Sequence, residues 1–189
     1  ALQEAMVQVS FLVVNTIINQ MGLMPSAGYG VAQKITSFIM LVPSAYMQSM
    51  SAFVAQNMGA GNPKRADWAL LCGVSTAFCV GLLMCVLTFF HGDLMAALFS
   101  SDAAVIAAAH SYLKAYAIDC LLTSFLFCFI GYFNGREKTL FVMLQGLIGA
   151  FGVRIPIVWL VSRIPGATLF QIGLGTPASS LVQVTLCLG

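Results

Sequence analysis

The stretch VAQNMGAGNPKRA, residues 54–66, interrupts an apolar sequence with glycines, an asparagine and a proline, and two basic residues follow directly. This composition predicts a tight turn between two helices. We expect Gly59 and Gly61 to supply backbone angles or close approaches that larger residues cannot adopt. Lys64 and Arg65 would hold the turn on the cytoplasmic face of a membrane.

The composition of the chain indicates an integral membrane protein. Of its 189 residues, 60% are hydrophobic and 7% are charged, whereas about 25% are charged in a typical soluble domain. The mean hydropathy is +0.95. A chain this apolar cannot cover itself with polar side chains, so the lipid bilayer is its expected partner. The net charge of +2 is small and no long basic run occurs, so nucleic acid is not expected as a partner.

Neither end of the chain resembles a signal peptide. It starts at Ala1 within one apolar pattern and stops at Gly189 within another, and it has no basic n-region with a cleavage site. We therefore expect a piece of a longer membrane protein.

Six membrane helices are expected, which makes the fold class all-α. The uncharged run at 68–90 would span roughly 35 Å at 1.5 Å per residue, enough to cross a bilayer. A β-barrel is not expected, because the apolar runs are too long and do not alternate. The predicted helices are about 1–22, 29–58, 68–90, 104–133, 139–161 and a truncated 177–189.

The loops between these helices differ in charge. The loops at 59–66 and 134–138 carry four basic residues, whereas 22–27 and 91–102 carry none and 163–176 carries one. Because cytoplasmic loops are enriched in Lys and Arg, we expect 59–66 and 134–138 in the cytoplasm and 91–102 outside. The expected location is a cell membrane that the chain crosses several times.

Three of the predicted helices carry one polar stripe each. The stripes are Glu4, Gln8, Asn15 and Asn19 on the first helix, Gln33, Ser37, Ser44, Gln48 and Ser51 on the second, and Tyr112, Tyr116, Asp119 and Thr123 on the fourth. At about 100° per residue, the first set lies within roughly 60° of arc. Such stripes indicate either hydrogen bonds between helices or a water-filled cavity.

Ionisable residues within the spans are candidates for function, because a charge at the bilayer centre costs about 2.5–3.5 kcal/mol. Asp119 lies about halfway along its helix and is the deepest acid. Arg154 precedes Pro156, and its guanidinium could satisfy carbonyl groups that the proline frees. Pro43 predicts a kink in the second helix.

At VAQNMGAGNPKRA the chain resembles the multidrug and toxic compound extrusion (MATE) family, in which a similar turn closes the second helix of each six-helix lobe. The resemblance extends over essentially the whole chain and continues in VNTIINQMG (14–22), AGYGVAQKITSFIMLVPSAYMQSMSAFVAQN (27–57), YLKAYAIDC (112–120), GYFNGREKTLFVM (131–143) and VRIPIVWLVS (153–162). It implies a twelve-helix antiporter of two lobes that exports drugs and organic cations in exchange for H⁺ or Na⁺. This chain would be the C-terminal lobe, and its partner the missing N-terminal lobe of the same protein.

The resemblance also implies a cation site. Many members place one acid on helix seven and one on helix ten of this lobe, and Glu4 and Asp119 lie on those helices, each about one turn from the expected place. Thr123 corresponds to the usual helix-ten position. Together with the polar stripes, this makes the candidate cavity residues Asp119, Glu4, Tyr116, Tyr112, Thr123, Gln8, Asn15, Gln48 and Ser44. No cofactor is expected besides the coupling ion.

Two other functions are consistent with the sequence. A lipid-linked sugar flippase of the same superfamily should carry more basic residues in its cavity, and Lys34, Lys114 and Arg154 are few. A membrane scaffold or receptor that does not transport is the other alternative. We do not expect an enzyme, because the sequence has no His-Glu-x-x-His, no Gly-x-Ser-x-Gly and no paired intramembrane aspartates.

Overall fold

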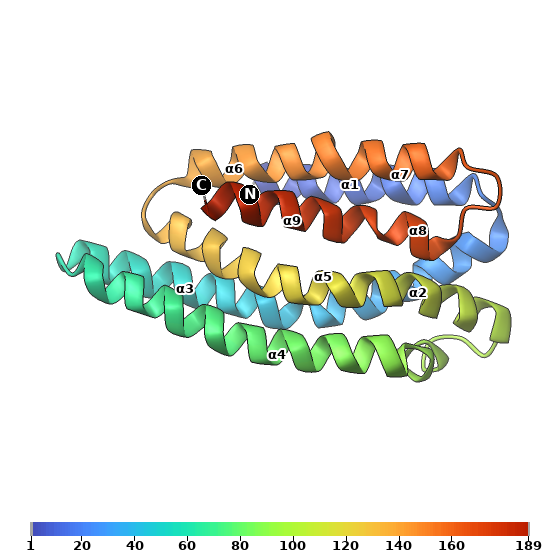
Figure 1. Cartoon of the computed structure of the whole chain (residues 1–189), viewed down its shortest axis with the longest axis horizontal. Coiled ribbons are helices and arrows are strands. Elements are labelled where there is room, and N and C mark those ends of the chain that lie inside the picture. Colours follow the sequence, from blue (N-terminus) through green and yellow to red (C-terminus); the bar gives the residue numbers. More distant parts are fainter. Residues whose placement is uncertain (1, 189) are drawn as a thin grey trace.

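The computed structural model describes residues 2–188 and the side chains of residues 5–188, and this part of the chain is built from helices and short turns (Figure 1). The elements are α1 (Leu2–Asn19), α2 (Leu23–Ile39), α3 (Leu41–Gly59), α4 (Pro63–Ala97), α5 (Ala103–Gly135), α6 (Thr139–Leu147), the π-helix η1 (Ile148–Arg154), α7 (Ile155–Ser162), α8 (Leu169–Gly173) and α9 (Gly175–Leu188).

The helices form two groups that share α5. In Figure 1, α2, α3 and α4 lie along one side of α5, and α1, α6, α7 and α9 lie along the other. α5 is buried along most of its length, because it contacts both groups. α2 and α3 form one interrupted rod, and α6, η1 and α7 form another.

Several helices are long and apolar enough to cross a membrane. In the described part of the chain these are Leu23–Gly59, Pro63–Ala97, Ala103–Gly135 and Thr139–Ser162. α4 exposes large apolar side chains along its length, among them Trp68, Phe90 and Leu94, which are 66%, 66% and 63% exposed. An apolar surface of this extent is stable only against lipid, so the chain is a multi-pass membrane protein.

The rod formed by α2 and α3 is interrupted near the place where the sequence predicts a kink. α2 ends at Ile39 and α3 begins at Leu41, so the break at Met40 lies three residues before Pro43. Proline has no backbone N–H, so the carbonyl group of Ile39 loses its partner four residues later. The helix is thus interrupted close to the proline for which the sequence predicts a kink.

Several predicted helix boundaries need correction. The second predicted helix starts at Leu23 instead of 29, and the third runs over Pro63–Ala97 instead of 68–90. The predicted loop at 163–176 contains α8, which begins where Thr168 and Gln171 cap each other. α4 extends beyond the predicted apolar run through polar and charged residues such as Lys64, Arg65 and Asp93, because a helix end can project into water.

The turn at 59–63 is a Schellman motif. The N–H of Asn62 donates to the carbonyl of Asn57 at 2.9 Å, and the N–H of Gly61 donates to that of Met58 at 3.1 Å. Gly61 has φ +72°, the left-handed conformation that this motif requires and that glycine adopts without strain. Gly59 is the last residue of α3, and a Cβ placed there would meet no atom within 4 Å. The prediction was therefore right for Gly61 and wrong for Gly59.

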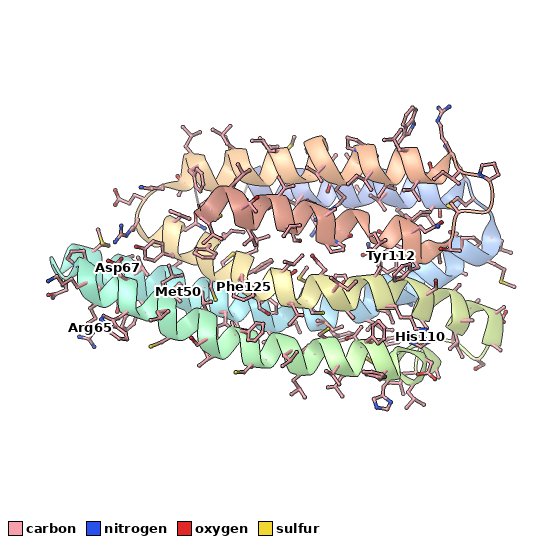
Figure 2. All side chains as sticks on the ribbon, viewed as in Figure 1. Met50, Arg65, Asp67, His110, Tyr112 and Phe125 are labelled. Atoms are coloured by element: carbon pink, nitrogen blue, oxygen red, sulfur yellow. The ribbon has the colours of Figure 1, made fainter. Side chains whose placement is uncertain are left out.

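The two basic residues after this turn begin α4. Lys64 and Arg65 are exposed in its first turn, and the guanidinium of Arg65 lies 5.7 Å from the centre of the Phe53 ring. Figure 2 shows Arg65 and Asp67 at the same end of the molecule.

The turn after α5 lies at this end as well. Asp67 Oδ1 accepts hydrogen bonds from Tyr132 Oη at 2.5 Å and from Arg136 Nη2 at 2.6 Å. The basic residues of both turns therefore gather at one end, whereas the connections after α1, α4 and α7 lie at the other (Figure 1).

Candidate functional site

A cavity of about 860 Å³ lies between the two helix groups. Its walls come from α1, α3, α5, α6, η1 and α9. It extends from Asn134 and Thr139, beside the turn after α5, to Asp119 and Arg154 in the middle of the bundle. The end of the cavity at Asn134 and Thr139 therefore lies at the end of the molecule that carries the basic turns.

The cavity wall combines apolar and polar side chains. Phe11, Met47, Phe127 and Met143 contribute aromatic and thioether surface. The polar side chains are Gln8, Ser44, Asp119, Thr123, Asn134, Thr139, Arg154, Ser180 and Gln183. Largely apolar pockets with a few placed polar groups are typical of sites for small organic molecules.

Asp119 is the acid of this cavity. Its side chain is 1% exposed, and Thr123 Oγ1 donates a hydrogen bond to Oδ2 at 3.1 Å. Among the described residues, Oδ1 has no hydrogen-bond partner. The side chains of Ser180 and Arg154 line the same cavity as this carboxyl group. A buried carboxyl group with an oxygen still available can accept a proton, a metal cation or an organic cation.

Arg154 enters the same cavity from η1. Its side chain is 6% exposed, Nη1 donates to Ser10 Oγ at 3.2 Å, and the guanidinium lies 4.4 Å from the centre of the Phe11 ring. These contacts are with side chains of α1 and not with the backbone carbonyls around Pro156 that the sequence suggested. The π-helix ends at Arg154 and sets the direction of this side chain.

The polar residues of α9 were not predicted as part of the site. Ser180 and Gln183 are 3% and 7% exposed and line the cavity, and the Gln183 amide donates to Ser179 Oγ at 3.1 Å. The sequence held a signal for them, because residues 179, 180 and 183 share one face of an otherwise apolar helix.

Four predicted site residues come together at the cavity. Gln8 of α1, Ser44 of α3, and Asp119 and Thr123 of α5 all line it. The three predicted polar stripes thus meet at the cavity, where α1, α3 and α5 face one another. The side chain of Glu4, the second predicted acid, lies outside the described residues.

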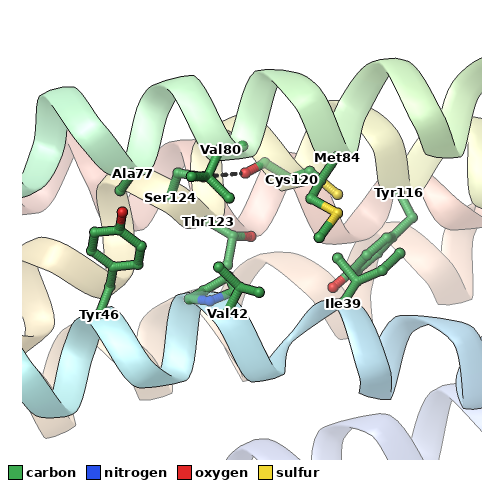
Figure 3. A pocket seen from close by; sticks show the side chains of 12 residues that line it. Ile39, Val42, Tyr46, Ala77, Val80, Met84, Tyr116, Cys120, Thr123 and Ser124 are labelled. Atoms are coloured by element: carbon green, nitrogen blue, oxygen red, sulfur yellow. Dashed lines mark hydrogen bonds between the residues drawn. The ribbon is translucent and has the colours of Figure 1, made fainter.

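The two predicted tyrosines lie elsewhere. Tyr112 is buried against Tyr29, with ring centres 5.1 Å apart and planes at 85°. Tyr116 lines a second, smaller pocket of about 20 Å³ between α2, α3, α4 and α5, where Met84 and Cys120 also lie (Figure 3). The stripe along α5 is continuous, but the helices that face it change along its length, so only Asp119 and Thr123 reach the large cavity.

Asn15 and Gln48 also lie away from the cavity. Asn15 is exposed about two turns beyond Gln8, past the depth at which Asp119 and Arg154 close the cavity. Gln48 is exposed on α3, although Ser44 and Met47 line the wall. The helical spacing showed which face of each helix is polar, but it could not show where along each helix the cavity ends.

Known proteins resemble the chain in sequence. The MatE family model matches residues 1–160. The probable multidrug resistance protein YoeA of Bacillus subtilis is 21% identical over 97% of this chain and 40% of its own length. The multidrug export protein MepA of Staphylococcus aureus (strain N315) is 26% identical over 93% of this chain and 37% of its own length. The chain thus spans about 40% of the length of these two relatives.

Solved structures show the same fold. A crystal structure of MATE in complex with MaD3S superposes with a TM-score of 0.90 and 14% identity, over 98% of this chain and 41% of that one. At that coverage the matched part corresponds to one lobe of the solved transporter. From the family model over residues 1–160, we conclude that this chain belongs to the MatE family of transporters.

Proposed function

We propose that the chain is the C-terminal lobe of a two-lobe antiporter that exports drugs or organic cations across the cell membrane, driven by H⁺ or Na⁺. The observation that carries this proposal is the buried Asp119 carboxyl group in the wall of a cavity of about 860 Å³ lined by aromatic and aliphatic side chains. The names of the relatives, multidrug resistance and multidrug export proteins, support it.

The wall of the cavity suits a lipophilic cation. The ring of Phe127 and the side chains of Met47 and Met143 would bury the apolar body of such a molecule, and the Asp119 carboxylate would attract its charge. A proton or Na⁺ on the same carboxylate would compete with that charge. Transport follows if the ion and the drug bind the two orientations of the lobes with different affinity.

The second lobe would complete the transporter. The relatives are more than twice as long as this chain, and Asn15 and Gln48 are exposed polar residues on α1 and α3. A polar amide facing lipid costs free energy, so we infer that these residues face the other lobe or water between the lobes.

The cavity would be reached from the cytoplasm. It extends to Asn134 and Thr139, beside the turns that carry Lys64, Arg65 and Arg136. The enrichment of basic residues at this end supports a cytoplasmic position. In this proposed orientation the cavity would open toward the cytoplasm, which suits the capture of a drug from inside the cell.

The lipid-linked sugar flippase has less support. A phosphate-bearing lipid would need several basic side chains in the cavity, and Arg154 is the only base among the described lining residues. A scaffold without transport would have no need for a buried acid in a cavity, and an efflux assay distinguishes it directly.

The experiment uses the full-length protein in cells that accumulate ethidium. We expect Asp119→Asn to reach the membrane at normal levels but to weaken efflux, because the amide is of similar size and lacks the charge. Asp93→Asn is the matched control, since Asp93 is an exposed acid near the end of α4, away from the cavity and from the basic turns. Normal efflux by Asp119→Asn, with unchanged dependence on pH and Na⁺, would exclude Asp119 from the mechanism.

A further inference from the structure

The fifth span contains a π-helix at the depth of the cavity. η1 covers Ile148–Arg154, between α6 and α7, and one residue, Ile155, separates it from Pro156. A π-helix inserts extra backbone into the helical register, and such insertions are frequent at functional sites. Its last residue is Arg154, so the insertion determines where this guanidinium points.

Among the described residues, the Arg154 guanidinium makes its direct contacts with uncharged side chains. Phe11 packs against it and Ser10 accepts one of its hydrogen bonds, but both partners are uncharged. Nε has no partner among the described residues. A guanidinium has five N–H donors, and a buried cation is normally paired with an anion. The environment of Arg154 thus leaves donors for an acidic group.

Asp119 does not satisfy this need directly. It lines the same cavity, but the described residues contain no Asp119–Arg154 ion pair within the 4.0 Å limit that defines Arg136–Asp67 as one. Asp119 belongs to α5 and Arg154 to η1, and both side chains line the same cavity of about 860 Å³. The cavity therefore offers two opposite charges at separate points of one wall.

From this arrangement we propose that Arg154 is a specificity residue that binds a carboxylate or phosphate group carried by the transported molecule. The planar fork of a guanidinium matches both groups in a bidentate geometry that an amine cannot reproduce. The substrate class is an apolar molecule with an acidic group, whose body packs on Phe11 and the other apolar side chains. This inference rests on the proposed transport function and adds a selectivity that the function does not require.

The test uses the purified full-length protein in detergent and a rhodamine dye in two forms, the free carboxylic acid and its ethyl ester. The two dyes share the chromophore and the positive charge, and only the acid carries a carboxylate. We expect the wild type to bind the acid about tenfold more tightly than the ester, as one charge-assisted hydrogen-bonded contact would produce. Fluorescence polarisation measures both Kd values.

Arg154→Gln should raise the Kd of the acid to that of the ester and leave the ester unaffected. Arg163→Gln is the matched control, because Arg163 also lies over an aromatic ring, 4.2 Å from the centre of Trp159, but is exposed outside the cavity. Arg154→Lys keeps the charge without the fork, so it should retain part of the preference and provides a second variant if Arg154→Gln does not fold.

Equal affinity of the wild type for the two dyes would overturn the proposal, as would an acid preference that survives Arg154→Gln. Phosphatidylglycerol added to the detergent distinguishes the source of the acidic group. If it abolishes the preference for the acid at concentrations far below the dye's, Arg154 binds a lipid headgroup and the proposal fails. A wild type that binds neither dye would instead contradict the transport function itself.

Discussion

Gly61 is the residue on which the turn between α3 and α4 depends. Its φ of +72° is strained for any residue with a Cβ, and no neighbour within 4 Å would be displaced by one. We expect Gly61→Val to lower the yield of folded protein, because the left-handed conformation costs about 1–2 kcal/mol and more for a β-branched side chain. Size-exclusion chromatography of the full-length protein in detergent measures this yield.

Two matched variants separate backbone strain from a general sensitivity of the turn. Gly59→Ala should be neutral, since Gly59 is helical with free space around it. Asn62→Ser should be mild, because the exposed Asn62 side chain makes one 3.3 Å hydrogen bond to the carbonyl of Ala60. Equal tolerance of Gly61→Val and Gly59→Ala would mean that the turn is only a polar linker.

Glu137 occupies the corresponding place after α5, but with a side chain. It has φ +62°, and the N–H of Lys138 donates to the carbonyl of Phe133 at 2.9 Å, as in the turn after α3. Glu137 is exposed, so its side chain has little packing to lose. We expect Glu137→Gly to stabilise the protein by about 1 kcal/mol, which thermal unfolding in detergent would detect as a higher midpoint. A lower midpoint would show that the carboxylate has a role that outweighs the strain.

At the scale of the helices, α3 and α5 approach each other closely at Gly131 of α5. A Cβ at Gly131 would lie 2.4 Å from the carbonyl oxygen of Met47, a backbone atom that cannot move aside alone. We expect Gly131→Ala to push the two helices apart and destabilise the protein by about 1–3 kcal/mol. The same thermal assay should show a lower midpoint.

Gly30→Ala is the control for Gly131→Ala. Gly30 lies within α2, is exposed, and would meet no atom within 4 Å. Because alanine favours a helix by about 1 kcal/mol over glycine, this variant should be neutral or more stable. A similar loss of stability in both variants would show that the loss at Gly131 does not come from its approach to Met47.

For the whole molecule, the predicted orientation can be tested at the two ends. The turns with Lys64, Arg65 and Arg136 lie at one end, and the connection that contains Ser101 lies at the other. In a variant without native cysteines, we expect Ser101→Cys to react with an impermeant maleimide added to intact cells. Asn62→Cys should react only after permeabilisation. The reverse pattern would invert the proposed topology and place the mouth of the cavity outside.

The membrane class, the helical fold and the position of the first tight turn follow from local properties of the sequence. Apolar runs select lipid as the solvent, and in lipid a helix satisfies its own backbone hydrogen bonds, so composition and run length suffice. Gly61 and Pro43 act through their own backbone, and their effects on the turn and on the kink could be predicted for that reason. Asp119 was identified because its depth in an apolar helix is visible in the sequence.

The cavity itself depends on the packing of helices that are far apart in the sequence. Arg154 meets Ser10 across 144 positions of the chain, and no local pattern reports that contact. Tyr116 and Asp119 share a stripe on α5 but face different pockets, because their neighbours belong to different helices. A cavity is the space that several elements leave between them, so its depth and lining are set by tertiary packing, whereas each helix presents its polar face whether or not a cavity lies there.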